Sequence, residues 1–204
     1  MKTFRFTLRL LLFSFSAFSQ TVSVEEFKKI TDSSGLKFEM PKEYKVTKII
    51  KNRDLDYSFA MINADSTMEV RYSIFTLKSR LKEYNDYQSS TNKTSDGMTN
   101  VMSDPNKLYW ALTLSTMSNL TNGNPRQGID YNKDAVKEEF NADFGTTVMF
   151  KLDCEYGKGY AAANLITLHK DNVADVLIVI LTNIKNSDKY YSEMLIPFHS
   201  LTYK

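Results

Sequence analysis

The amino-acid sequence predicts an α/β (α+β) fold, in which helices cover both faces of one antiparallel β-sheet. Three strand-like segments, residues 146–154, 160–169 and 173–184, follow one another with only short turns between them, which indicates an antiparallel meander. Residues 176–181 are apolar at every position, which is typical of a central strand covered on both faces. Residues 104–122 have a broad apolar helical face, which indicates packing against the sheet.

The chain is expected to enter this fold through a short helix and a short strand. Ser23 and Glu26 have the spacing of a capping box, and Gly35 stands just after the expected helix end. Residues 36–41 then alternate in polarity and close with a proline, which predicts a short strand.

Residues 57–62 and 68–77 predict two further strands, joined by a polar turn. In the second of them, Glu69, Arg71 and Ser73 alternate with apolar residues. We therefore expect one face of the sheet to be wetter than the other.

The helix of residues 104–122 has clear signals at both ends. Asp104 fits the cap before the first turn, and Gly123 fits the position just past the end. The apolar face consists of two adjoining stripes, and one of these contains Trp110 and Leu114. We expect the whole face to pack on the sheet.

Three other segments complete the chain. Residues 88–100 are rich in Ser, Thr, Asn and Asp, which indicates an exposed loop. Residues 132–142 predict a second, more polar helix. A last helix is expected to be capped by Ser187 and to bend or end at Pro197.

Residues 1–19 have the features of a cleavable secretory signal peptide. Lys2, Arg5 and Arg9 form a basic segment, an apolar run follows, and small residues stand near residue 19. No cysteine lies near this point, so no lipid attachment is expected. We therefore expect residues 20–204 to be exported, to the periplasm or the medium, as a single α/β sandwich domain.

Composition and charge exclude several classes of protein. The chain is 42% hydrophobic and 25% charged, which is typical of globular proteins and not of disordered ones. Without residues 1–19 it has 23 basic and 24 acidic residues, a net charge of −1, because only three basic residues are removed. A nucleic-acid binder normally carries a basic surface, so no nucleic acid is expected. No second apolar segment approaches the length of about 20 residues that spans a membrane, so stable insertion is not expected.

The order of elements resembles that of the PsbP-like family. Gly35, Phe38 and Pro41 fit the opening Gly-x-x-Phe-x-x-Pro of that family, and the meander of residues 146–184 with the helix of residues 187–200 is similar to its end. The resemblance implies an α/β sandwich over most of residues 35–204. It also implies an accessory or binding subunit of a larger assembly, and it transfers no catalytic residue.

Asp130, Asn132 and Asp134 have the spacing that opens a calcium-binding loop. Position six of such a loop should be Gly and is Ala135, and position twelve should be Glu and is Asn141. The alternative is that Asn132 and Asp134 simply begin a helix, whose dipole favours acidic residues. No metal or other cofactor is predicted.

Cys154 is the only cysteine, and it falls on the apolar face of the strand expected at residues 146–154. We interpret it as a small buried side chain, while a nucleophilic thiol is the alternative. Neither His169 nor His199 stands in a metal-binding spacing, so no zinc site is expected. We interpret both as surface histidines.

These observations leave three hypotheses for the function. The first is an exported, non-enzymatic accessory or binding protein of the cell envelope, with a protein partner or a small ligand. The second is an exported hydrolase whose site contains carboxylates of residues 130–143 or the thiol of Cys154. The third is a carrier of a small apolar ligand, with its cavity between sheet and helix under Trp110.

Overall fold

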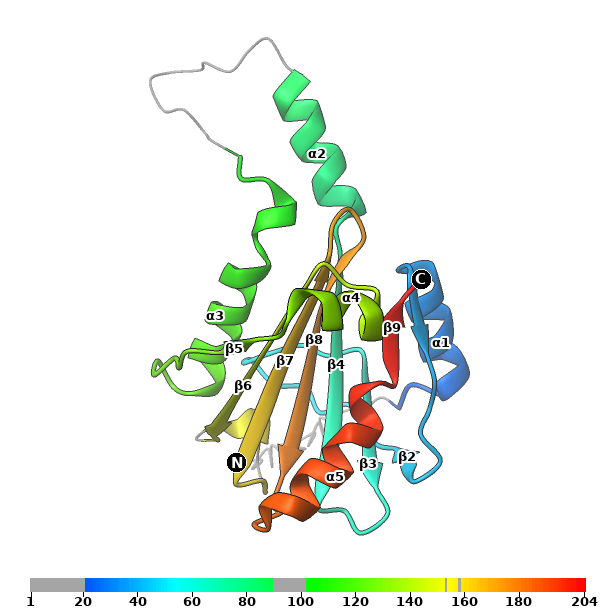
Figure 1. Cartoon of the computed structure of the whole chain (residues 1–204), viewed down its shortest axis with the longest axis vertical. Helices are drawn as coiled ribbons and strands as arrows, with labels where there is room; N and C mark the ends of the chain where they lie inside the picture. The colour runs from blue at the N-terminus through cyan, green and yellow to red at the C-terminus, as the bar shows by residue number, and fades with distance from the viewer. Residues whose placement is uncertain (1–20, 90–101, 153, 158) are drawn as a thin grey trace, which may run out of the picture.

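The computed structural model describes residues 21–89, 102–152, 154–157 and 159–204. The predicted signal segment and residues 90–100 of the predicted loop lie outside the described residues. An antiparallel sheet forms the centre of the described structure (Figure 1). From one edge to the other, its strands are β2 (Tyr44–Val46), β3 (Phe59–Asn63), β4 (Met68–Thr76), β8 (Ala174–Thr182), β7 (Ala162–Lys170), β6 (Phe144–Lys151) and β5 (Ile129–Asp130).

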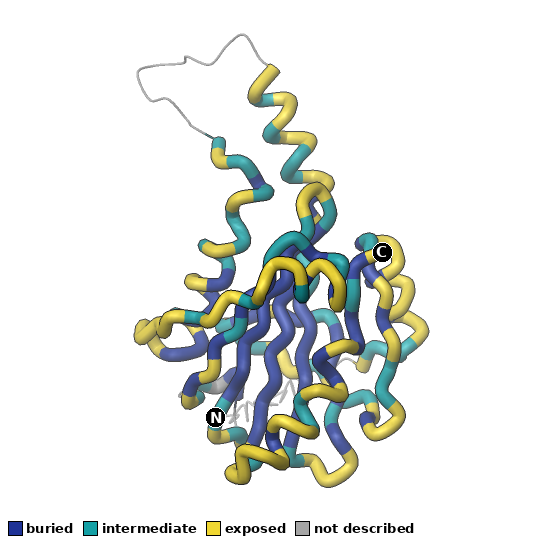
Figure 2. Tube along the Cα trace, viewed as in Figure 1, coloured by how far each residue is buried: buried dark blue, intermediate teal, exposed yellow. Residues whose placement is uncertain are grey.

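The middle of the sheet matches the sequence prediction closely. β8 lies fourth in the order, and all of its residues are buried, as expected of a strand covered on both faces. Figure 2 shows this buried centre as a group of dark blue strands. β6, β7 and β8 are consecutive antiparallel neighbours, so the predicted meander is confirmed.

A second, two-stranded sheet closes the fold near both ends of the described chain. In it, β1 (Leu36–Phe38) pairs antiparallel with β9 (Leu201–Tyr203). α1 (Val24–Ser33) precedes it and begins with the predicted capping box. The Glu26 amide donates to Ser23 Oγ at 3.2 Å, and the Ser23 amide donates to Glu26 Oε2 at 2.8 Å.

Three helices and the small sheet cover one face of the large sheet. The helices are α1, α4 (Lys133–Phe140) and α5 (Ser187–Phe198), and each places an aromatic ring in the same core. Asn132 caps α4, as predicted for the start of a helix. Asn186, and not Ser187, caps α5, because Asn186 Oδ1 accepts a hydrogen bond from the Lys189 amide at 2.9 Å.

The opposite face is covered by a second core. It contains Met117 and Leu120 of α3 (Tyr109–Leu120), Tyr57 from the loop before β3, and Tyr156 of the short 3-10 turn η2 (Glu155–Gly157). α2 (Lys78–Ser89) buries none of its residues and extends away from the sheet (Figure 1). Helices therefore lie on both faces of an antiparallel sheet, and the predicted fold class is confirmed.

The expectation of a wetter face on β4 is wrong. Glu69, Arg71 and Ser73 are all buried, because the loop before β3 and η2 cover this part of the sheet. The three side chains find partners there: Arg71 Nε lies 2.6 Å from Glu69 Oε1, and Ser73 Oγ donates to the Asp56 carbonyl at 2.6 Å. Internal pairing of this kind is what allows polar groups to be buried.

Two boundaries differ from the prediction. The segment of residues 104–122 begins with the 3-10 turn η1 (Pro105–Lys107), and α3 follows it as a separate helix. Trp110 and Leu114 of α3 are exposed, because Thr113 occupies the contact with the sheet and its hydroxyl bonds to Thr167 at 2.9 Å. β6 ends at Lys151, so Cys154 is not on a strand and instead lies half-buried against the second core.

Candidate functional site

Exposed apolar side chains gather at one edge of the large sheet. Among the described residues, nine large apolar side chains are exposed, and six of them line two hollows beside β5 and β6. We call these six side chains the edge surface; they are Trp110, Leu114, Ile129, Met149, Tyr191 and Leu195. A concentration of this kind is typical of an interaction site, whereas single exposed apolar residues are ordinary.

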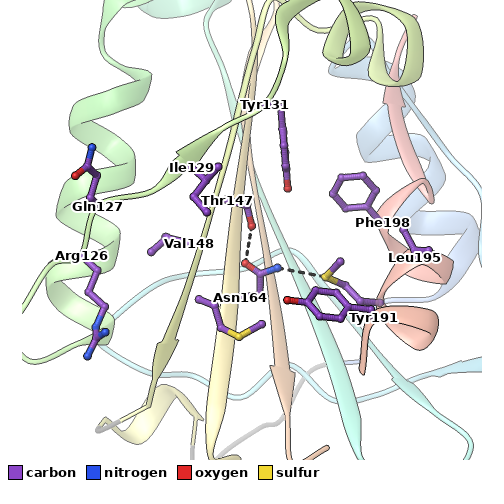
Figure 3. Close-up of a pocket in the computed structure, with 12 residues that line it drawn as sticks. Arg126, Gln127, Ile129, Tyr131, Thr147, Val148, Asn164, Tyr191, Leu195 and Phe198 are labelled. Carbon is purple, nitrogen blue, oxygen red and sulfur yellow. Dashed lines mark hydrogen bonds between the residues drawn. The ribbon is translucent and has the colours of Figure 1, made fainter. Parts of the chain in front are cut away.

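The first hollow lies between α5 and the β5–β6 edge and encloses about 640 Å³. Figure 3 shows Tyr191, Leu195 and Phe198 of α5 on one side of it, with Ile129 of β5 across from them. Ile129 is 73% exposed, the largest exposed fraction among these apolar side chains. Such exposure costs free energy in water, so this hollow is suited to an apolar occupant.

A small polar group lies at the floor of the first hollow. Asn164 of β7 is buried, and its Oδ1 accepts a hydrogen bond from Thr147 Oγ1 at 2.6 Å (Figure 3). Its Nδ2 lies 3.3 Å from the Met194 sulfur, which is a weak acceptor. Burial raises the pKa of Tyr131, whose ring borders the same space, so its hydroxyl stays protonated at neutral pH. The floor therefore offers hydrogen bonds without a charge.

The second hollow lies between α3 and the β5–β6 edge and encloses about 470 Å³. Trp110, Leu114 and Met117 of α3 form its helical side, and Phe144, Thr146 and Val148 of β6 form its floor. The indole of Trp110 is 60% exposed at its rim. This is the place between sheet and helix where the sequence suggested a cavity under Trp110.

The two hollows adjoin at the sheet edge. Arg126, Gln127 and Val148 line both of them. Arg126 makes no ion pair with any residue that the structure describes, and Asp130 is the one acidic residue among the described residues that line either hollow. An apolar surface with an unpaired guanidinium at its centre can recognise a ligand that combines apolar groups with a carboxylate.

Two of the three calcium candidates, Asn132 and Asp134, serve to start α4. Asn132 Oδ1 accepts from the amides of Asp134 and Ala135 at 2.9 and 3.2 Å, which is the geometry of a helix cap. Asp134 lies in the first turn of α4, and Asp130 lines the second hollow. In the ranges that the model describes, no group of three or more His, Cys, Asp or Glu side chains is placed to hold a metal ion.

The expectation that His169 is a surface residue is wrong. Its side chain lies on β7 directly opposite Asp175 of β8, with Nδ1 2.6 Å from Asp175 Oδ1, and it is 1% exposed. Nε2 lies 2.9 Å from Asp171 Oδ1, and the ring stacks on Tyr109 at 4.4 Å. Burial alone would lower the pKa of His169, but the two carboxylates outweigh it and raise this pKa above its usual value.

His199 is half-exposed, as expected, and its Nε2 lies 2.9 Å from Glu139 Oε2. The sequence did not indicate Ile129 or Leu195 as site residues. For Met149 a signal was present, because it alternates with the apolar residues of β6 and so falls on their opposite face.

No helix in the part of the chain that the structure describes is long and apolar enough to cross a membrane. No protein-family model and no curated protein matches this chain.

Proposed function

We propose that this chain is an exported, non-enzymatic accessory or binding protein of the cell envelope, and that it binds through the edge surface. The observation that carries the proposal is that six of the nine large apolar side chains exposed among the described residues gather around two adjoining hollows. An exposed apolar surface of this kind marks a site where a ligand or partner binds and removes the apolar groups from water.

The chemistry of the lining supports binding. Aliphatic, thioether and aromatic groups form most of both hollows, and amides and hydroxyls supply hydrogen bonds. Tyrosine and tryptophan are enriched among residues that dominate binding energies, and Tyr191 and Trp110 stand at opposite ends of the edge surface, on α5 and α3. The signal-like residues 1–19 support export, and the PsbP-like resemblance supports an accessory role.

A carrier of a small apolar ligand is the second candidate. The volume of the hollow under Trp110, about 470 Å³, is in the range of small-molecule sites. A carrier would use this hollow alone, whereas a larger partner would cover both hollows and the edge between them.

Native mass spectrometry on the mature chain, recovered gently from its own cells, tests the proposal. The key variant is Ile129→Glu, which places a charge at the most exposed point of the edge surface. Ile50→Glu is the matched control, because Ile50 is also exposed, at 57%, but lines neither hollow. We expect added mass on the wild type and on Ile50→Glu, and its loss on Ile129→Glu. A bare chain in all three samples, or equal added mass in all three, would contradict the proposal.

A further inference from the structure

The two hollows lie on opposite faces of the same strand. Thr147 and Met149 of β6 line the hollow on the α5 side, whereas Thr146 lines the hollow on the α3 side, and successive side chains of a strand point to opposite faces. A second strand laid beside β6 would also direct alternate side chains to the two faces. Its side chains would therefore enter both hollows in turn.

The backbone of β6 is open on the side where such a strand would lie. β5 pairs with β6 only at Thr146 and Thr147, and no other described strand pairs with β6 on this side. The Tyr131 amide donates to the Gly145 carbonyl at 2.9 Å, so Gly145 directs its backbone groups toward this edge. Because these directions alternate along a strand, the backbone N–H and C=O groups of Met149 and Lys151 point outward as well.

The charges at this edge specify the occupant further. Two exposed basic side chains, Arg126 and Lys151, stand at this edge against one exposed acidic side chain, Asp130 of β5, so basic charge is in excess. Neither basic side chain makes an ion pair with a residue in the described ranges. A second copy of the chain, paired through the same edge, would bring two such basic edges together, which is unfavourable. A carboxylate on a different partner would neutralise this charge.

We propose that the occupant is an extended segment of a partner polypeptide, apolar at alternate positions and carrying an acidic residue, that adds as a strand beside β6. This inference rests on the proposed function and deepens it, because it names the chemistry of the partner. Backbone hydrogen bonds to Met149 and Lys151 hold the segment, the two hollows select its side chains, and Arg126 binds its carboxylate.

Selection from a library of random displayed dodecapeptides on the mature protein provides the test. We expect the enriched peptides to alternate apolar and polar residues and to contain Asp or Glu. Met149→Pro removes the outward N–H, whereas Met149→Ala removes the side chain and keeps that N–H, so the pair separates backbone from side-chain binding. We expect Met149→Pro to bind the selected peptides at least about tenfold more weakly than Met149→Ala does.

Amide hydrogen exchange on the wild-type protein gives an answer that does not depend on a variant folding. The amides of Met149 and Lys151 should exchange quickly in the free protein and slowly once a selected peptide is bound. Equal binding to both Met149 variants, or unchanged exchange at these two amides, would overturn strand addition. Enriched peptides without alternation, or no enrichment at all, would also overturn it. The proposed function would survive each of these results if the mass added to the wild type is still lost on Ile129→Glu.

Discussion

Arg71→Met tests whether the polar group buried on β4 is held together as the structure indicates. The Arg71 side chain is 3% exposed, and its Nε lies 2.6 Å from Glu69 Oε1. Its guanidinium lies over two neighbouring rings, 4.8 Å from the centroid of Tyr57 and 4.5 Å from that of Tyr156. The guanidinium also donates to the Tyr156 carbonyl. The substitution keeps an unbranched side chain of similar length but removes the charge and every donor.

The expected loss of stability comes from the Glu69 carboxylate, which stays buried after Arg71→Met. The Glu69 side chain is 8% exposed. Without Arg71, the hydrogen bond from the Tyr160 hydroxyl, at 3.1 Å, is the one that its carboxylate keeps from the described side chains. Removing one partner of a buried ion pair costs about 3–5 kcal/mol, because the other charge stays buried without compensation. The two cation–π contacts act in the same direction. Because the guanidinium is desolvated, each is worth about 2 kcal/mol, which places the expected loss in the upper part of that range.

Urea unfolding of the mature protein, followed by far-UV circular dichroism, measures this loss. The double variant Glu69→Gln with Arg71→Met should recover about half of it or more, since no charge is left buried. Lys37→Met is a control in an exposed ion pair with Glu39, at 2.7 Å, and should leave the midpoint almost unchanged. A loss below about 1 kcal/mol for Arg71→Met, or an equal loss in the double variant, would refute the reasoning.

Three other outcomes follow from the same structure. The carboxylate of Asp175 helps raise the folded-state pKa of His169 above 6.5. The ion pair between protonated His169 and Asp175 therefore stabilises the fold fully below pH 6.5, and this stabilisation declines as the pH rises through the folded-state pKa. Urea unfolding between about pH 6 and 8 should show this decline, and His169→Gln should lack it; a rise in stability would contradict the assignment. Asn132→Ala removes the α4 cap and should cost about 1 kcal/mol in the same assay, whereas no loss would mean that the cap is not formed in solution. Phe27→Ala should cost about 3–5 kcal/mol, because the ring is fully buried and stacks on Phe59 at 4.3 Å; a loss near that of a surface substitution would contradict the packing of α1.

The long elements were predictable because their own residues determine them. The uninterrupted apolar run in β8 requires cover on both faces, and the capping box at Ser23 fixes the start of α1. The short strands β2, β5 and β9 were missed, since two or three residues carry no periodicity and become strands only by pairing with a partner.

The burial of polar residues was not predictable, for a related reason. Alternation on β4 shows that Glu69 and Arg71 share a face, but the cover comes from Tyr57 and Tyr156, the second of which is 85 residues further along the chain than Arg71. His169 is likewise covered by the Tyr109 ring of α3 and paired with Asp175, which reaches it only through the pairing of β7 with β8.

The candidate site was predictable only in part. Trp110 was identified from the sequence, but it was assigned to a packed helical face, and the structure exposes it. Tyr191 and Leu195 join the same site because α5 packs on the same face of the sheet and faces the β5–β6 edge across the first hollow, as Figure 3 shows. Such a meeting of distant segments is a property of the tertiary fold and not of local periodicity.

Site-specific photo-crosslinking in the cells that make this protein is the most direct test of binding at the edge surface. A photoreactive amino acid at Ile129 would lie on the edge surface, and the same amino acid at Ile50 would be exposed but away from both hollows. We expect a discrete adduct from position 129 and none from position 50. Adducts of equal yield at both positions, or none at position 129, would contradict binding at the edge surface.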